Sequence, residues 1–273
     1  MARGRPWIDL ALIDSAPYGE AMRSDFEDLL EVGASADVSG WDFSWLEGRA
    51  TEERPPWGYA RLLAEQLTTA TASLDIQTGG GEVLAEAGTF PPVAVATESW
   101  APNIAAATAR LHLRGVAVVA DPDEPPLPFA DGAFDLVTSR HPATIHWTEI
   151  ARVLRPGGTY LAQHVGPASA FELIEYFLGP APDARRGRDP EVECAEARAA
   201  GLEILDLRTA RLRMEIFDVA AVVYLLRKVI WWIPDFTVER YRDRLRDLHE
   251  QIRADGSFVA HSSRHLIEAR RPR

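Results

Sequence analysis

Cysteine, lysine and long apolar runs are all scarce in this sequence, and each scarcity excludes a class of protein. Cys194 is the single cysteine among 273 residues, so no disulfide forms within the chain and no multi-cysteine metal site is available. No stretch approaches 18 consecutive apolar residues, which argues against a membrane-spanning helix. The first twelve residues lack the long apolar segment of a secretory signal peptide, so we expect a cytoplasmic protein.

Positive charge is also scarce. The 29 Lys and Arg residues face 41 Asp and Glu residues, which gives a net charge of −12, and Lys228 is the one lysine. A broad surface that neutralises phosphates is therefore not expected, so nucleic acid is an improbable partner. No spacing of His, Cys and Asp residues indicates a metal site, and no nucleophile elbow or phosphate loop is present. We expect a small-molecule substrate, and the chain is free to form a homo- or hetero-oligomer.

Apolar segments typical of strands and helices alternate along most of the chain. The hydrophobic fraction of 47% is enough for a sizeable core. Short strands separated by helices of about ten residues predict a parallel sheet with helices on both faces. The predicted strands are 72–76, 93–97, 116–120, 134–138, 159–165, 202–217 and 258–269. The predicted helices are 58–69, 82–87, 103–114 and 145–154, with a helical pair at 219–233 and 238–253.

These elements predict one α/β domain over residues 1–273. Its parts are an N-terminal helical and aromatic segment (1–57), a nucleotide-binding core (58–205) and a C-terminal part (206–273). The C-terminal part holds the last two strands, with a helical insertion at 219–253 between them.

A glycine-rich turn joins the first core strand to its helix. Residues 75–82 read DIQTGGGE, and such a turn lets the backbone approach a ligand at the carboxyl edge of a sheet. Glu98 ends the second core strand, where an acidic side chain can bind both hydroxyls of a ribose. This order of elements, in which a strand, a turn, a helix and a second strand precede an acidic residue, indicates a nucleotide-type ligand.

Three segments in order resemble the motifs of class I S-adenosylmethionine (SAM)-dependent methyltransferases. Residues 75–82 resemble motif I, D-x-G-x-G-x-G; residues 127–137 (LPFADGAFDLV) resemble L-P-F-x-D-x-x-F-D-x-V; residues 149–158 (EIARVLRPGG) resemble E-x-x-R-V-L-R-P-G-G. The resemblance covers roughly residues 58–170. It implies a seven-stranded Rossmann-like sheet with helices on both faces, and places the helical insertion between its last two, antiparallel strands.

The resemblance also implies a SAM site. Asp75 opens motif I, Gly79 and Gly81 would line the methionine half, and Glu98 would bind the ribose hydroxyls. Asp121 or Asp123 would approach the adenine amino group. Residues 139–141, which begin with Ser139, would face the methionine and the substrate.

Motif I departs from the family pattern at one position, because Gln77 stands where the family has its first glycine. A glutamine there has two possible consequences. Its side chain points away and is tolerated, or it reshapes the pocket through its bulk or through an unfavourable backbone angle and weakens SAM binding.

Three side chains are candidates for chemistry. His141 follows the fourth core strand and is placed to act as a general base, or else to pack on its loop. Arg140 could hold a carboxylate, sulfate or phosphate of the substrate, or form a surface ion pair. His164 ends the fifth core strand and has either a catalytic or a structural role.

Three functional hypotheses follow. The first is a SAM-dependent methyltransferase acting on a small molecule, a secondary metabolite being the expected class. The second keeps the fold but catalyses intramolecular displacement in natural-product biosynthesis, for example aziridine formation with loss of sulfate held by Arg140. The third is a non-catalytic methyltransferase-like subunit that binds a partner.

Overall fold

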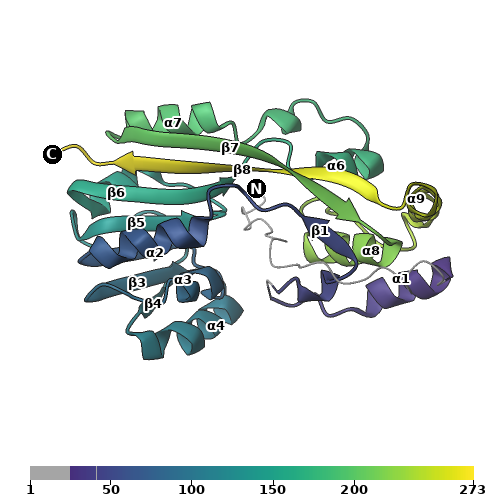
Figure 1. Cartoon of the computed structure of the whole chain (residues 1–273), viewed down its shortest axis with the longest axis horizontal. Helices are drawn as coiled ribbons and strands as arrows, with labels where there is room; N and C mark the ends of the chain where they lie inside the picture. The colour runs from purple at the N-terminus through teal and green to yellow at the C-terminus, as the bar shows by residue number, and fades with distance from the viewer. Residues whose placement is uncertain (1–24, 41) are drawn as a thin grey trace.

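A computed structural model describes residues 25–40 and 42–273 (Figure 1). Residues 1–24 and 41, which belong to the predicted N-terminal segment, lie outside the described residues. One eight-stranded sheet organises the rest, in the order β1-β7-β8-β6-β5-β2-β3-β4. The strands are β1 (Ala50–Glu52), β2 (Ala72–Ile76), β3 (Val93–Glu98), β4 (Ala117–Ala120), β5 (Phe134–Arg140), β6 (Leu154–Val165), β7 (Glu203–Ile216) and β8 (Phe258–Arg270).

The sheet is parallel from β4 to β6 and antiparallel at the other side. β8 lies between β6 and β7 and runs antiparallel to both. The seven predicted strands are confirmed, and so is the antiparallel arrangement of the last two, which the helical insertion separates. The eighth strand, β1, was not predicted; it pairs antiparallel with the end of β7, with Ala50 opposite Ile216.

Helices cover both faces of the sheet because successive side chains of each strand point to opposite sides. Leu136 packs in the core beneath α2 and α4, whereas the next residue, Val137, packs in the core beneath α5 and α7. These helices are α2 (Tyr59–Thr69), α3 (Glu82–Glu86), α4 (Ala101–Leu111), α5 (Trp147–Val153), α6 (Phe171–Leu178) and α7 (Pro190–Ala199). Short 3₁₀ turns occur at Ser44–Leu46, His112–Arg114 and Ala184–Arg186.

A third hydrophobic core, in addition to the two on the faces of the sheet, surrounds the helical insertion. α8 (Val219–Lys228) and α9 (Arg242–Asp255) separate β7 from β8, as predicted, although α8 ends earlier than expected. α8 packs on α1 (Phe26–Ser35), and Gly33 makes this approach possible because a Cβ there would lie 2.6 Å from the carbonyl oxygen of Ala220. Figure 1 shows these helices grouped around the far ends of β7 and β8.

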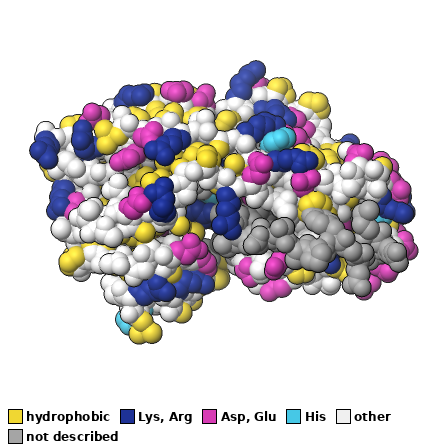
Figure 2. Space-filling model, in the orientation of Figure 1, with side chains coloured by type: hydrophobic (Ala, Val, Ile, Leu, Met, Phe, Trp, Pro, Cys, Tyr) yellow, Lys and Arg dark blue, Asp and Glu magenta, His cyan; other side chains and the backbone are white. Residues whose placement is uncertain are grey.

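The surface carries both signs of charge. Figure 2 shows Arg and acidic side chains interspersed over the described part of the visible face, with no broad basic patch. Among the described helices, none combines the length and the apolar character that a bilayer crossing requires.

Candidate functional site

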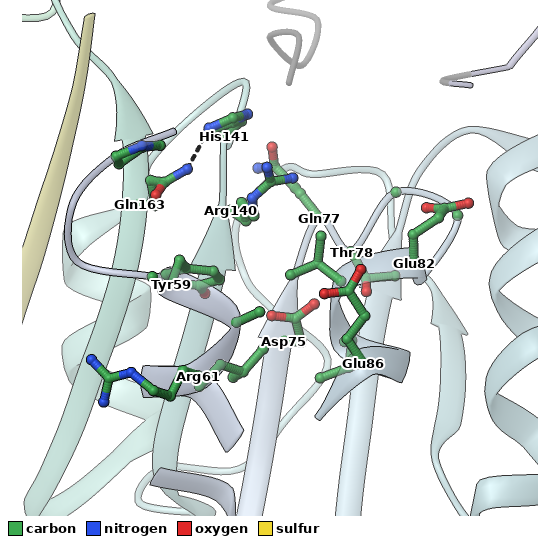
Figure 3. A pocket seen from close by; sticks show the side chains of 18 of the residues that line it. Tyr59, Arg61, Asp75, Gln77, Thr78, Glu82, Glu86, Arg140, His141 and Gln163 are labelled. Atoms are coloured by element: carbon green, nitrogen blue, oxygen red, sulfur yellow. Dashed lines mark hydrogen bonds between the residues drawn. The ribbon is translucent and has the colours of Figure 1, made fainter. Parts of the chain in front are cut away.

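A pocket of about 310 Å³ lies at the carboxyl ends of the parallel strands. Asp75 and Gln77 reach it from β2 and the turn after it, Arg140 from β5, and Gln163 from β6 (Figure 3). Tyr59 and its neighbours at the start of α2 form another wall. Ligands of open α/β sheets bind at this edge, so the pocket is the candidate site.

Gln77 adopts the backbone angle usual for glycine and anchors its side chain. Its φ is 57°, in the left-handed region that is unfavourable for residues other than glycine. Its amide nitrogen donates to the carbonyl oxygen of Thr144 at 2.8 Å, and its amide oxygen accepts from the backbone N–H of Ala143 at 2.6 Å. The side chain therefore joins the turn after β2 to the loop after β5 while still lining the pocket.

Glu98 is buried at the end of β3 and is held by backbone donors. One carboxylate oxygen accepts from Gly79 at 2.8 Å, and the other accepts from Ser99 and Trp100 at 3.0 Å each. Burial raises the pKa of Glu98, and these N–H groups oppose that rise. A carboxylate has about four acceptor positions. The three backbone N–H groups occupy three of those of Glu98, and one remains for a ligand hydroxyl.

Several buried polar atoms beside Glu98 have no hydrogen-bond partner in the described part of the chain. They are Asp121 Oδ2 and Asp123 Oδ1, and Asn103 Nδ2 in the first turn of α4 belongs to the same set. The backbone N–H of Asp121 donates to the carbonyl oxygen of Glu98 at 3.0 Å, which brings the ends of β3 and β4 together. Burial raises the pKa of Asp121, and so does the neighbouring charge of Asp123. Native proteins rarely leave buried polar atoms unpaired, so this cluster fits a polar ligand.

Asp75 lies on the floor of the pocket and is almost completely buried. The hydroxyl of Thr138 donates to its carboxylate at 2.6 Å. Burial raises the pKa of Asp75 to about 6, against the effect of that hydrogen bond. The carboxyl therefore changes charge close to neutral pH.

A chain of hydrogen bonds fixes His141. The indole N–H of Trp57 donates to the amide oxygen of Gln163 at 2.8 Å, and the amide nitrogen of Gln163 lies 3.0 Å from Nε2 of His141. The backbone of His141, with φ 54°, also donates to the carbonyl oxygen of Gln163 at 2.7 Å. Trp57 and Gln163 were not among the predicted site residues, because nothing in their local sequence shows which side chain they contact.

The other predicted residues of β5 differ in orientation. Arg140 lines the pocket, where burial and the nearby charge of Arg264 lower its pKa to about 9. Ser139 does not line this pocket; its hydroxyl donates to the carbonyl oxygen of Ile76 at 2.9 Å and ties β5 to β2. The carbonyl oxygen of Ser139 accepts from the hydroxyl of Tyr59 at 3.1 Å.

His164 lies on the opposite face of the sheet from the pocket. It neighbours Gln163 in β6, so their side chains alternate, and that of His164 is completely buried against α7. Its Nδ1 atom lies 2.7 Å from Glu193 and its Nε2 atom 3.0 Å from the hydroxyl of Tyr160. Burial lowers the pKa of His164.

Comparison with known families finds a match in the central part of the chain. Residues 74–162 match the family model described as a methyltransferase domain. The matched segment, about a third of the chain, is similar to that family. It runs from β2 through β6 and contains the glycine-rich turn, Glu98 and the strand that bears Arg140. No curated protein sequence matches the chain.

Solved structures share the fold of this chain. A proposed methyltransferase from Bacillus halodurans superposes with a TM-score of 0.53 at 19% identity, over 78% of this chain and 99% of that one. The YcgJ protein from Bacillus subtilis gives 0.54 at 16% identity, over 79% and 98%. A functionally unknown protein from Deinococcus radiodurans gives 0.53 at 16% identity, over 84% and 94%. At these identities the likeness concerns the fold.

Proposed function

We propose that the protein is a SAM-dependent methyltransferase whose acceptor is a small molecule. The observation that carries the proposal is the cluster of unpartnered buried polar atoms beside Glu98, within the part of the chain that matches the methyltransferase family. A nucleoside presents hydroxyls, ring acceptors and an amino group, which are the partners that such a cluster needs.

Different residues around the cluster would contact different parts of the adenosine half of SAM. The free acceptor position of Glu98 would take a ribose hydroxyl. Asp121 and Asp123 would accept from the adenine amino group, and the amide nitrogen of Asn103 would donate to an acceptor of the nucleoside. Trp100 begins the next helix and leaves 45% of its surface exposed, so its ring is available for stacking on a base.

The 310 Å³ pocket would hold the acceptor. SAM supplies an electrophilic methyl group, and the contribution of the protein is to align the acceptor atom with it. Arg140 would bind an anionic group of the acceptor, and Asp75, with a pKa of about 6, would be available to take a proton near neutral pH. His141 lines the pocket, and its Nε2 accepts from the amide N–H of Gln163. In the neutral ring the proton then lies on Nδ1, so His141 would donate a hydrogen bond to the acceptor and would not serve as the base.

Isothermal titration calorimetry with SAM and S-adenosylhomocysteine tests the proposal. We expect micromolar binding by the wild type, at least about tenfold weaker binding by Glu98→Ala, and unchanged binding by Glu250→Gln, an exposed control on α9. Absence of binding by all three folded proteins would reject SAM as the cofactor. Acceptors would then be screened by release of S-adenosylhomocysteine.

Ring closure without methyl transfer is a second candidate function, and Gln77 is the observation that favours it. Its side chain occupies part of the pocket at the position where the family has glycine. An amine would attack a carbon bearing a sulfate, the sulfate would leave as an anion held by Arg140, and the amine proton would pass to Asp75. This function predicts no SAM binding by the wild type and restored binding in Gln77→Gly.

A further inference from the structure

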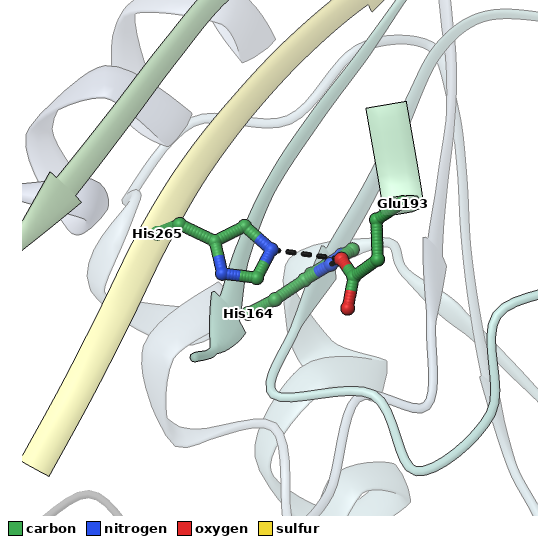
Figure 4. A group of neighbouring side chains, drawn as sticks. All are labelled: His164, Glu193 and His265. Carbon is green, nitrogen blue, oxygen red and sulfur yellow. Dashed lines mark hydrogen bonds and ion pairs between the residues drawn. The ribbon is translucent and has the colours of Figure 1, made fainter. Parts of the chain in front are cut away.

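Three side chains that can each ligate a metal ion meet on the face of the sheet that lies away from the pocket. His164 of β6 and His265 of β8 are direct partners in the antiparallel pair, so both imidazoles project from the same face. α7 covers this face and contributes Glu193 (Figure 4). The three exposed fractions are at most 10%.

The donor atoms converge on one point. Oε2 of Glu193 lies 2.7 Å from Nδ1 of His164 and 2.7 Å from Nε2 of His265. The three atoms lie within 4.8 Å of one another. Ligands of a tetrahedral zinc ion with bonds of about 2.0–2.1 Å are separated by about 3.3 Å. An ion would therefore need each of the two distances from Glu193 to an imidazole nitrogen to lengthen by about 0.6 Å, which side-chain rotation can supply.

The two imidazoles differ in where they can hold the ring proton that a metal would displace. Nε2 of His164 lies 3.0 Å from the hydroxyl of Tyr160, which can accept as well as donate. Nδ1 of His265 is buried and has no hydrogen-bond partner within the described residues. A shift of tautomer in both rings would free two nitrogen lone pairs toward Glu193. Tyr160 would then accept from His164 and orient it, whereas the Nδ1–H of His265 would have no acceptor within the described residues.

We propose that His164, Glu193 and His265 bind one divalent transition-metal ion of the zinc type. Two imidazole nitrogens and one carboxylate oxygen suit zinc and cobalt, whereas magnesium and calcium prefer oxygen ligands alone. The site does not open into the 310 Å³ pocket, so its role is to fasten α7 to β6 and β8. Because Gln163 precedes His164 on β6 and holds His141, the ion also stiffens one wall of the pocket.

Metal titration of the full-length protein tests the site. After treatment with a chelator and desalting, we expect one zinc ion per chain with submicromolar affinity, and a visible absorption spectrum of tetrahedral character with cobalt. His265→Gln and Glu193→Gln should each weaken zinc binding at least about 100-fold. Magnesium should give no signal in any protein.

A second histidine–glutamate pair provides the matched control. His261, also on β8, lies 3.1 Å from Glu172, and within the described residues this pair belongs to no group of three potential metal ligands. His261→Gln should keep wild-type zinc affinity, and zinc should raise the melting temperature of this variant and of the wild type only. Chelator-treated, folded wild type that binds neither zinc nor cobalt would overturn the proposal, as would equal zinc affinity in His265→Gln. If His265→Gln does not fold, the cobalt spectrum of the wild type would show whether imidazole nitrogens ligate the ion.

Discussion

The amide nitrogen of Gln163 faces Nε2 of His141 at 3.0 Å because Trp57 already occupies the amide oxygen of Gln163. An amide nitrogen cannot accept a hydrogen bond, so Nε2 of His141 must be the unprotonated ring nitrogen. This arrangement fixes a neutral imidazole with its proton on Nδ1.

Long-range ¹⁵N–¹H spectra of the histidines check this tautomer. We expect the Nδ1–H form in the wild type and an Nε2–H group in Gln163→Glu, where a carboxylate oxygen replaces the amide nitrogen. Gln251→Glu, an exposed change on α9, should leave the signals of His141 unmoved. A wild-type spectrum with protonated Nε2 would contradict the assignment.

Two substitutions at Gln77 should have unequal effects on stability. Gln77→Ala removes two hydrogen bonds but keeps the left-handed backbone, so we expect a loss of about 1–3 kcal/mol in the free energy of unfolding. Gln77→Gly loses the same bonds but relieves about 1 kcal/mol of backbone strain, which leaves it clearly more stable than Gln77→Ala. Urea denaturation measures both. Equal stability of the two variants would show that the φ of 57° carries no strain.

Asp75 should make the protein less stable as the pH rises. Burial raises its folded-state pKa from 3.8 to about 6, so the folded state binds its proton more tightly than the unfolded chain does. This stabilisation is complete below about pH 4 and is lost as the pH rises through about 6. Asp75→Asn should therefore match the wild type at pH 4 and exceed it by up to about 3 kcal/mol at pH 8.

Denaturation curves at several pH values measure the difference between these two proteins. The exposed Asp247→Asn should follow the wild type throughout. Parallel pH profiles for wild type and Asp75→Asn would mean that the carboxyl remains ionised in the folded protein.

A buried ion pair secures β1 to the sheet. Arg264 of β8 donates to Glu52 of β1 at 2.9 Å, and both side chains are at most 3% exposed. Glu52→Gln leaves a buried guanidinium without its charge partner, and we expect a loss of about 3–5 kcal/mol in the free energy of unfolding. Adding Arg264→Met should recover part of that loss. A double-mutant cycle measures the coupling, and additive losses would show that the pair is not coupled.

Periodicity and motifs predicted most of the architecture. Strands such as 134–138 are short apolar segments bounded by turns, and their physical signal is local. β1 has only three residues and no alternating pattern in its sequence. It is held by pairing with β7 and by the contact of Glu52 with Arg264, which lies 212 positions away. Contacts of that kind cannot be derived from one sequence.

The candidate site was likewise predicted only in part from the sequence. Gln77 and Glu98 were predicted because they occupy fixed positions around a turn. The partners of His141 were missed because Trp57 and Gln163 come from separate elements that only the folded sheet brings together. His164, Glu193 and His265 have no meaningful spacing along the chain, and they meet because β8 enters the sheet beside β6.

β7 and β8 pair without interruption from Asp206 opposite Glu268 to Ile216 opposite Phe258, and the same two strands contribute to the core beneath α7 and to the core around α8. A hinge needs a few residues whose torsion angles are free to change, and a paired ladder offers none. We therefore expect the helical insertion to move with the sheet as one body. We expect any movement that admits a substrate to involve residues 54–58, which join β1 to α2 and line the pocket through Arg54, Pro55 and Gly58.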